Sequence, residues 1–348
     1  MLYDYAGCIH FHSDHSFDGF IPVSDIIRAA RKNALDFIML TDHSSLGAKP
    51  MEGWYGNTLL VVGQEISPRF NHYIAFGTSR PVFVEEDAGL LPQSYIDEVQ
   101  RQGGIGFISH PDHRGAPMFH VKHYPWLDWS VSGFTGMGIW DFMTDWQSSL
   151  TGRMKAIMSL FSPALMLKGP EERTLRRWDA LTRTRRVAGI GEIDNHAVPR
   201  SLGTVHFRVF PFERIFRYIR THVMSDEMLT GDGQRDAAAI LRLLERGRAY
   251  IAMDYFKKAE GFSFMIGDGE KHAFMGDEFS LANEAVLHVT AAEQGKIRII
   301  KDGKLWSEVD SDICNCPVRE KGVYRVEVFL KRFGMLRPWI FSNPIYVR

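Results

Sequence analysis

The sequence contains few cysteines and no excess of charge of either sign. Its 348 residues include 3 cysteines, 41 basic residues and 42 acidic residues. A disulfide framework is excluded because only one residue separates Cys314 from Cys316, and the low thiol count suits a reducing compartment. The balanced charge gives no strong field that would attract nucleic acid or an anionic membrane.

Long apolar runs and common phosphate-binding or nucleophile motifs are also missing. The nearest candidate for a membrane span, residues 154–167, is too short and is interrupted by Pro163. The opening MLYDYAGCIHFHS lacks the basic segment and apolar run of a signal peptide. Neither a Walker-type loop nor a GxSxG motif occurs. We therefore expect a cytoplasmic protein with no membrane or stable nucleic-acid partner, and its oligomeric state stays open.

Short apolar runs that end in polar residues or glycine recur along most of the chain. Helical patterns lie between several of them, at 22–35 with Ser24 as the predicted N-cap, at 91–104, and at 236–250 with Gly247 as the stop. Unalternating strands separated by helices predict a parallel sheet covered on both faces, either a β/α barrel or a doubly wound sheet. The runs are 7–12, 36–43, 58–65, 72–77, 104–111, 136–141 and 186–194.

The pattern changes twice along the chain. Residues 118–186 are rich in Trp, Met, Phe and Arg and predict a helical insertion. Beyond about residue 257, β-branched and aromatic segments alternate with turn signals, and Asp302-Gly303 predicts a hairpin turn. We expect a first domain over 1–257 and a small antiparallel β-sandwich over 258–348.

Polar side chains with metal-binding capacity follow most of the apolar runs. Because functional groups gather at the carboxyl ends of parallel strands, these side chains are expected to converge. His72 is the exception, since it begins a run. Taken singly, a histidine is more often a surface or hydrogen-bonded core residue, but repetition over most of the strands argues against chance. The residues are His10, His12, Asp42, His43, Glu65, His72, His110, Asp194 and His196.

The motifs HFHSDHSFDG, TDHSSL, GQEIS, HYIAFG, ISHP and GIGEIDNHA resemble, in order and spacing, those of the PHP (polymerase and histidinol phosphatase) superfamily. The resemblance covers roughly residues 5–199. It implies an α/β fold, a distorted (β/α)7 TIM-like barrel, with up to three metals at the carboxyl ends of the strands. The segments GVYRVEV and WIFSNPIYV resemble, more loosely, the small β domain of some members related to carbamate and amide hydrolases.

The resemblance also implies a ligand set for two to three divalent ions. A mixed nitrogen and oxygen set without cysteine suits Zn, Mn or Fe. The last motif reads EIDNHA where many relatives have SDAH, so Glu192 and Asn195 are expected to alter the local pocket. The implied ligands are His10, His12, Glu65 and Asp194 for one metal, Glu65, His72 and His110 for a second, and Asp18, His43 and His196 for a third.

Three further residues are candidates for catalysis or positioning. Arg114 would hold a phosphate oxygen and His113 would protonate the leaving group, and an ordinary charged loop is the alternative for both. Asp42 would orient its neighbours or a ligand. Asp14 and His15 fall off the implied ligand pattern.

Three functions remain open at this point. The first is a metal-dependent phosphoesterase that hydrolyses a small phosphate mono- or diester through a metal-bound hydroxide. The second uses the same site on an amide, carbamate or ester. The third is a non-enzymatic binding module, which would predict eroded ligands, whereas the implied ligand set is intact.

Overall fold

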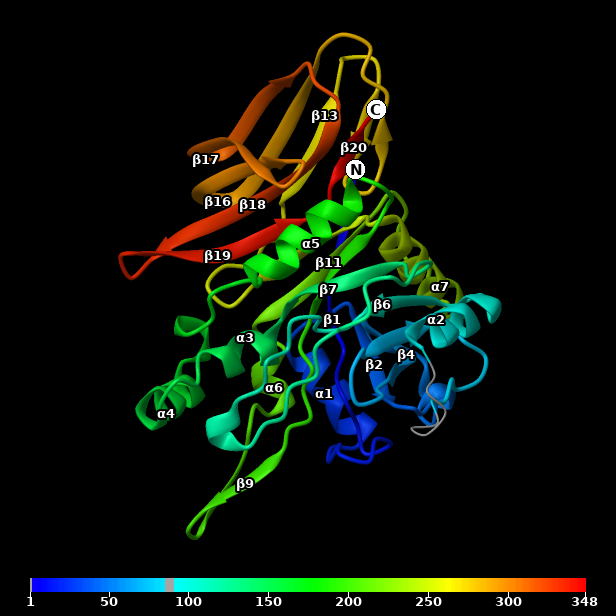
Figure 1. Cartoon of the computed structure of the whole chain (residues 1–348), viewed down its shortest axis with the longest axis vertical. Coiled ribbons are helices and arrows are strands. Elements are labelled where there is room, and N and C mark those ends of the chain that lie inside the picture. The colour runs from blue at the N-terminus through cyan, green and yellow to red at the C-terminus, as the bar shows by residue number, and fades with distance from the viewer. Residues whose placement is uncertain (1, 85–90) are drawn as a thin grey trace.

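The computed structural model describes residues 2–84 and 91–348. Strands and helices alternate as far as α7, and only strands follow it (Figure 1). The helices are α1 (Val23–Lys32), α2 (Pro92–Arg101), α3 (Phe142–Ser148), α4 (Arg153–Phe161), α5 (Glu172–Thr182), α6 (Phe212–Ile215) and α7 (Gly233–Arg246), with 3₁₀ turns η1 (Lys49–Met51), η3 (Pro117–Phe119) and η4 (Pro163–Leu165).

Strands form most of the remaining framework. The first group is β1 (Tyr3–Ile9), β2 (Phe37–His43), β3 (Gly53–Tyr55), β4 (Thr58–Ile66), β5 (Tyr73–Phe76), β6 (Ile105–Ile108), β7 (Gly136–Asp141), β8 (Ala188–Glu192), β9 (Pro199–Leu202), β10 (Val205–Arg208), β11 (Ile219–Ser225) and β12 (Ala249–Met253). The C-terminal group is β13 (Ser263–Gly267), β14 (His272–Phe274), β15 (Glu278–Phe279), β16 (Ala285–Lys301), β17 (Lys304–Val318), β18 (Gly322–Arg332), β19 (Met335–Ser342) and β20 (Ile345–Val347).

The fold is mixed α/β, with a large sheet whose first half is mainly parallel. Parallel pairs join β1 to β2, β2 to β4, β6 to β7 and β7 to β8. The expectation of parallel strands throughout is wrong for β5, which runs antiparallel to β4 and β6. Residues 67–72 are too few for the crossover that a parallel return from β4 to β5 needs. β11 also runs antiparallel to β1 and β12.

The predicted elements match the structure closely. All seven apolar runs form strands, namely β1, β2, β4, β5, β6, β7 and β8, and the three helical patterns form α1, α2 and α7. Gly247 ends α7 in the left-handed region at φ 74°, as the sequence predicted. Ser24 is not the N-cap of α1, because the helix begins one residue earlier, after Pro22, with no side-chain cap.

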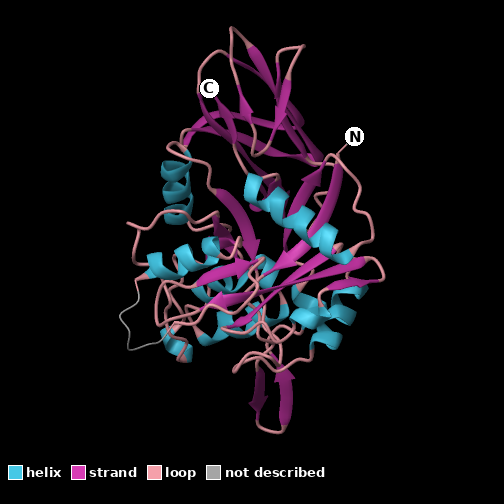
Figure 2. Ribbon diagram, turned by 90° about the vertical axis from the view of Figure 1, so that its right-hand side faces the viewer, coloured by secondary structure: helices cyan, strands magenta, loops and turns pink. Residues whose placement is uncertain are grey.

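The expected helical insertion over 118–186 is interrupted by a strand of the main sheet. Within it lie α3, α4 and α5, but β7 is fully buried between β6 and β8. Farther along the chain, the β9–β10 hairpin projects from the rest of the molecule (Figure 2).

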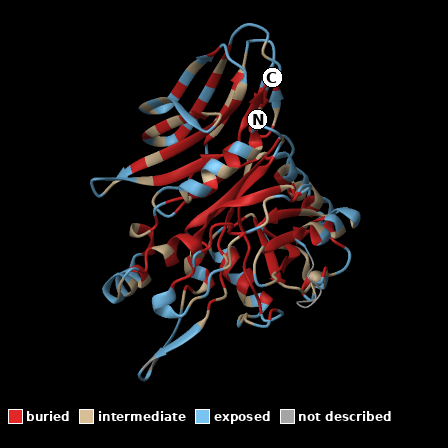
Figure 3. Cartoon of the chain, in the orientation of Figure 1, coloured by how far each residue is buried: buried red, intermediate tan, exposed pale blue. Residues whose placement is uncertain are grey.

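The C-terminal region is antiparallel, as predicted. β16 pairs with β13, β17 and β18, and its buried and exposed residues alternate, as the striped strands of Figure 3 show. Asp302 and Gly303 form the predicted two-residue turn between β16 and β17, with φ 51° and 82°. β19 pairs with β12 as well as β18, so this region continues the large sheet, and the domain boundary near 257 stays a prediction.

Buried apolar side chains form three clusters. One lies between the strands and helices α1 and α2, and another fills the C-terminal region. The third combines alternate residues of β1, β2, β4, β5, β6 and β8 with Ile240 and Leu244 of α7. No helix within residues 2–84 and 91–348 has the length and apolar character to cross a membrane.

Candidate metal centre

The strand ends bring all nine implied ligands together at one edge of the sheet. The β4–β5 and β5–β6 pairs are antiparallel, so the start of β5 lies beside the carboxyl ends of β4 and β6. This explains how His72, which precedes its strand, reaches the same place as the others. In each of three groups, one ligand atom per residue lies within 4.8 Å of every other. The groups are His10, His12, Glu65 and Asp194; Glu65, His72 and His110; and His12, Asp18, His43 and His196.

The first group is a compact four-atom cage. The Nε2 atoms of His10 and His12 lie 3.4 and 3.5 Å from Glu65 Oε2, and 3.5 and 3.4 Å from Asp194 Oδ1. Ligands about 2.1 Å from a tetrahedral zinc ion are about 3.4 Å apart. The spacing of these atoms therefore fits a divalent ion.

Glu65 and His12 connect the first group to the other two. Glu65 Oε1 lies 2.8 Å from His72 Nδ1 and 3.3 Å from His110 Nε2. His12 belongs to both the first and third groups, a sharing that the sequence analysis did not anticipate. The third group also has Asp18 Oδ2 3.3 Å from His43 Nε2 and 3.2 Å from His196 Nε2.

Several polar atoms of the three ligand groups have no hydrogen-bond partner although they are buried. Among the described residues these include Nε2 of His10, both ring nitrogens of His12, Oε2 of Glu65 and Nδ1 of His110. Buried polar groups in folded proteins are almost always paired, since leaving one unpaired costs about 1–3 kcal/mol. The orphaned atoms and their chemistry fit divalent ions, and the individual ligand roles stay predictions.

The backbone is strained at three of these positions. His10, His110 and Asp194 have φ values of 69°, 28° and 42°, a region that residues other than glycine rarely adopt. Such strain costs on the order of 1–3 kcal/mol per residue and concentrates at functional sites. Each residue directly or closely follows a strand, so the strain turns its side chain toward the cluster.

Glu192 supports the cage from behind. It is fully buried, and its Oε1 accepts hydrogen bonds from Ser109 Oγ at 2.7 Å and His10 Nδ1 at 3.1 Å. Its Oε2 accepts from the backbone N–H of His110 at 2.9 Å. A carboxylate on Nδ1 fixes the imidazole tautomer and leaves Nε2 free to bind a metal. From the sequence we expected only an altered pocket, because Ser109 and His10 come from distant strands.

Two further contacts orient the entrance side of the centre. Asp42 accepts from the backbone N–H and the hydroxyl of Ser13 at 2.6 and 2.7 Å, which fixes the loop that follows His12. Ser67 Oγ is hydrogen-bonded to His43 Nδ1 at 2.7 Å. These contacts place Asp42 where the sequence analysis expected an orienting residue, and Ser67 is a positioning residue that it missed.

Mutual attraction keeps the carboxylates of the cage charged. Burial alone would raise the pKa of Glu65, but His10, His43 and His72 hold it well below its ordinary value. Burial likewise raises the pKa of Asp194, and the nearby imidazoles of His10 and His12 outweigh it, so that the net shift is downward. The centre therefore offers anionic oxygens to a cation across the neutral pH range.

Arg114 and His113 have different surroundings, and their catalytic roles stay predictions. The Arg114 side chain is 64% exposed and pairs with Glu171 at 3.1 Å. His113 is buried, and its Nδ1 accepts from the backbone N–H of Tyr124 at 3.1 Å. Burial and the neighbouring His110 lower the pKa of His113 to about 3, so it is neutral and lacks the proton that an imidazolium donor would supply.

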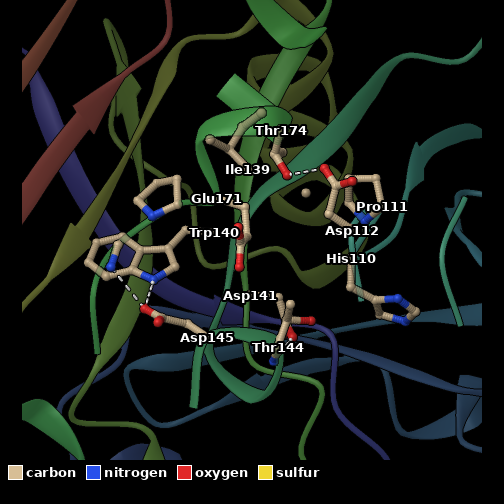
Figure 4. A pocket seen from close by; sticks show the side chains of 13 residues that line it. His110, Pro111, Asp112, Ile139, Trp140, Asp141, Thr144, Asp145, Glu171 and Thr174 are labelled. Atoms are coloured by element: carbon tan, nitrogen blue, oxygen red, sulfur yellow. Dashed lines mark hydrogen bonds between the residues drawn. The ribbon is translucent and has the colours of Figure 1, made fainter. Parts of the chain in front are cut away.

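A small pocket adjoins the centre at His110 (Figure 4). Asp141 caps α3 by accepting from the backbone N–H of Thr144 at 2.6 Å, and its other oxygen, Oδ1, is buried without a partner. Burial and the charges of Asp194 and Glu192 raise the pKa of Asp141 to about 7. Asp141 and His110 thus line the same small pocket.

The centre opens to solvent on one side. The side chain of Asp18 is 35% exposed, whereas those of the first cage are between 0 and 16% exposed. Asp14 and His15 are exposed and lie outside the three groups. A substrate would therefore approach from the side of Asp18 and His196.

Comparisons with known proteins find distant similarities. No protein-family model matches the chain. Over 93 residues, 25% of the chain, it is 28% identical to an uncharacterized protein of Methanocaldococcus jannaschii, and the chain spans about half the length (50%) of that relative. A proposed metal-dependent phosphoesterase of Bifidobacterium adolescentis, solved by crystallography, aligns with 58% of this chain and 92% of its own at 14% identity and a TM-score of 0.32.

Proposed function

We propose that the chain is a metal-dependent phosphoesterase of the PHP type that hydrolyses a small phosphate mono- or diester. The observation that carries the proposal is the set of three ligand groups connected by Glu65 and His12. Connected groups of this kind suit neighbouring divalent ions, and closely spaced metals serve phosphatases and nucleases by stabilising both the attacking and the leaving oxygen.

The proposed fold is the distorted seven-stranded barrel of that superfamily. Two hydrogen bonds between β8 and β1 and their extensions support closure, from the N–H of Ile193 to the carbonyl of Ile9 at 3.1 Å and from the N–H of His12 to the carbonyl of Asn195 at 3.0 Å. The residues that β1, β2, β4, β5, β6 and β8 direct to one side share a single apolar cluster, as the interior of a barrel requires.

The chain's own residues would prepare this reaction by holding the ligands. When bound, divalent ions polarise water and the phosphoryl oxygens, which supplies both the nucleophile and charge stabilisation. Glu192 fixes the tautomer of His10, Ser67 orients His43, and Asp42 holds the loop after His12. Asp18 and His196 would contact the substrate side because they border the opening.

The placement of Arg114 favours a second candidate, hydrolysis of an amide, carbamate or ester. Arg114 pairs with Glu171 and belongs to none of the three ligand groups. If Arg114 stays paired with Glu171 and does not hold a phosphate dianion, a phosphoester substrate loses a contact that a neutral carbonyl substrate would not need. Inhibition by inorganic phosphate would favour the phosphoesterase, because phosphate is the product of phosphomonoester hydrolysis.

The test is hydrolysis by protein loaded with Zn, Mn or Fe, measured on phosphomonoesters, phosphodiesters, aryl carbamates and anilides. We expect turnover of phosphoesters that disappears in Asp194→Asn, a variant that removes an anionic oxygen of the cage while keeping its size. Activity that survives at the parent rate in this variant would contradict the proposed role of Asp194 as a ligand. Turnover of carbamates or anilides alone would replace the proposal with the second candidate.

The compartment and partners follow as proposals. The cysteines are free thiols, and Cys314 Sγ lies 3.3 Å from Cys316 Sγ as a hydrogen-bonded pair. Free thiols suit a reducing compartment, and we place the protein in the cytoplasm with a small phosphorylated substrate as its partner.

A further inference from the structure

A large apolar side chain stands at the opening of this polar centre. Phe17 is 85% exposed although it lies between Ser16 and the predicted ligand Asp18. Its ring stacks on the imidazole of His43, with centroids 4.9 Å apart and planes inclined by 21°. A single exposed apolar side chain is ordinary by itself, and what distinguishes Phe17 is that its ring lies against a candidate ligand of the metal centre.

The turn that carries Phe17 is held firmly on both sides. The Ser16 hydroxyl donates to Asp18 Oδ1 at 3.0 Å and accepts from the backbone N–H of His43 at 3.2 Å. At Gly19, a Cβ atom would lie 1.8 Å from the carbonyl oxygen of Ser13, so the turn packs too closely for any other residue. Phe17 is therefore presented at a defined place beside His43.

Phe17 ends a series of stacked rings that runs into the centre. His43 stacks on His12 at 4.4 Å and 27°, and His12 stacks on His196 at 4.0 Å and 19°. Phe17 is the outermost ring of the series and the one that is most exposed. A further flat ring could continue the series from the solvent side.

A second aromatic side chain borders the cluster at His72. Tyr124 stacks on His72 at 5.2 Å and 30° and lies 5.6 Å from the ring of His113. Aromatic rings thus lie against the imidazoles of both His43 and His72.

We propose that Phe17 forms a stacking subsite for a planar aromatic or heteroaromatic ring carried by the substrate next to the group that is cleaved. Stacking of this kind adds roughly two- to ten-fold in affinity beyond simple burial. The inference rests on the proposed function only in assigning the ring to the substrate, because the subsite itself requires no particular reacting group.

The test compares flat rings with puckered rings of similar size. Calorimetric Kd values are measured for the zinc-loaded protein with phenylphosphonate against cyclohexylphosphonate, and with benzoate against cyclohexanecarboxylate. For each pair that binds, we expect the compound with the flat ring to have a Kd about five-fold lower than that of the compound with the puckered ring. Phe17→Leu should remove the preference because it keeps apolar bulk without a flat face, and Phe17→Tyr should retain it.

The outcomes separate this subsite from the phosphoesterase assignment. Equal affinities within each pair, or a preference that persists in Phe17→Leu, would overturn the subsite whatever the enzyme hydrolyses. Binding of the carboxylates with the flat-ring preference, but of neither phosphonate, would overturn phosphoester hydrolysis and keep the subsite. If none of the four compounds bound, both assignments would be lost.

Discussion

At the scale of single residues, the side chains that cluster in the structure could be selected from the sequence, whereas most of the contacts that support them could not. His10 and His12 stand out because histidines alternate at a strand end. Glu192 and Ser67 do not, because a buried glutamate or a serine acquires its role only from partners on other strands. His72 is an intermediate case. It precedes its apolar run, and it reaches the other candidate ligands because β5 is antiparallel to β4.

Replacing Glu192 with glutamine should weaken metal binding. The backbone N–H of His110 requires an acceptor, so the amide oxygen would face it and the NH₂ group would face His10 Nδ1. His10 would then carry its proton on Nε2, the atom aimed at the cage. We expect metal affinity to fall by about 10- to 100-fold, measured by competition with a chelator.

The matched control for that substitution is Glu270→Gln, at an exposed position far from any ligand in sequence. It removes the same charge without touching the cage, so its metal affinity should equal that of the parent protein. Equal affinities in the Glu192 and Glu270 variants would show that Glu192 does not set the tautomer of His10.

At the scale of elements, the short apolar runs predicted the strands. They did not predict the direction of each strand, which depends on the length of the chain that connects it to the preceding strand. The run 72–77 reads like its neighbours, yet the short connection before it makes β5 antiparallel. The turn at Asp302 and Gly303 was predictable because its residue types favour positive φ. The run 136–141 predicted β7, which interrupts the insertion as a fully buried strand of the main sheet.

Strand β7 also requires glycine at position 138. A Cβ atom at Gly138 would lie 1.5 Å from Glu192 Oε2, so the carboxylate occupies the space that a side chain would take. Gly138→Ala should lower the free energy of unfolding by about 1–3 kcal/mol and displace Glu192. Urea denaturation measures the first effect, and the metal affinity should fall in parallel.

Gly152→Ala provides the control, because no atom lies within 4 Å of the Cβ it would add. Because Gly152 is the N-cap of α4, its replacement by alanine should cost no more than about 1 kcal/mol of unfolding free energy. If Gly138→Ala were as stable as Gly152→Ala and its metal affinity were unchanged, the Glu192 carboxylate would be able to move aside without a loss of stability or of metal binding.

At the scale of the whole molecule, a buried polar network joins the first strand to the chain that leads into the C-terminal region. His222 of β11 contacts Asp4 Oδ1 at 2.8 Å through Nδ1 and Asp254 Oδ2 at 3.3 Å through Nε2. The Tyr250 hydroxyl donates to Asp4 Oδ2 at 2.6 Å. None of this was predictable from the sequence, since His222 and its partners belong to no motif and meet only through strand pairing.

The network predicts a loss of stability in alkaline solution. Burial alone would lower the pKa of His222, but Asp254 and Asp4 raise it to about 10, above its ordinary value of about 6.5. A raised folded-state pKa stabilises the protein fully below the unfolded-state pKa, and this contribution is lost as the pH rises through 10. The unfolding free energy should therefore fall between pH 7 and 10, by on the order of 4 kcal/mol.

Urea denaturation at intervals from pH 7 to 10 measures this decline, and two substitutions assign it. His222→Gln has no proton to lose, so its stability should be lower at pH 7 and should change much less with pH. His288→Gln, at an exposed position on β16, should retain the slope of the parent protein. Stability loss from other titrating groups would appear equally in all three proteins. Parallel slopes would therefore contradict His222 as the source of the decline. A flatter slope in His222→Gln alone would show that deprotonation of His222 destabilises the fold in alkaline solution.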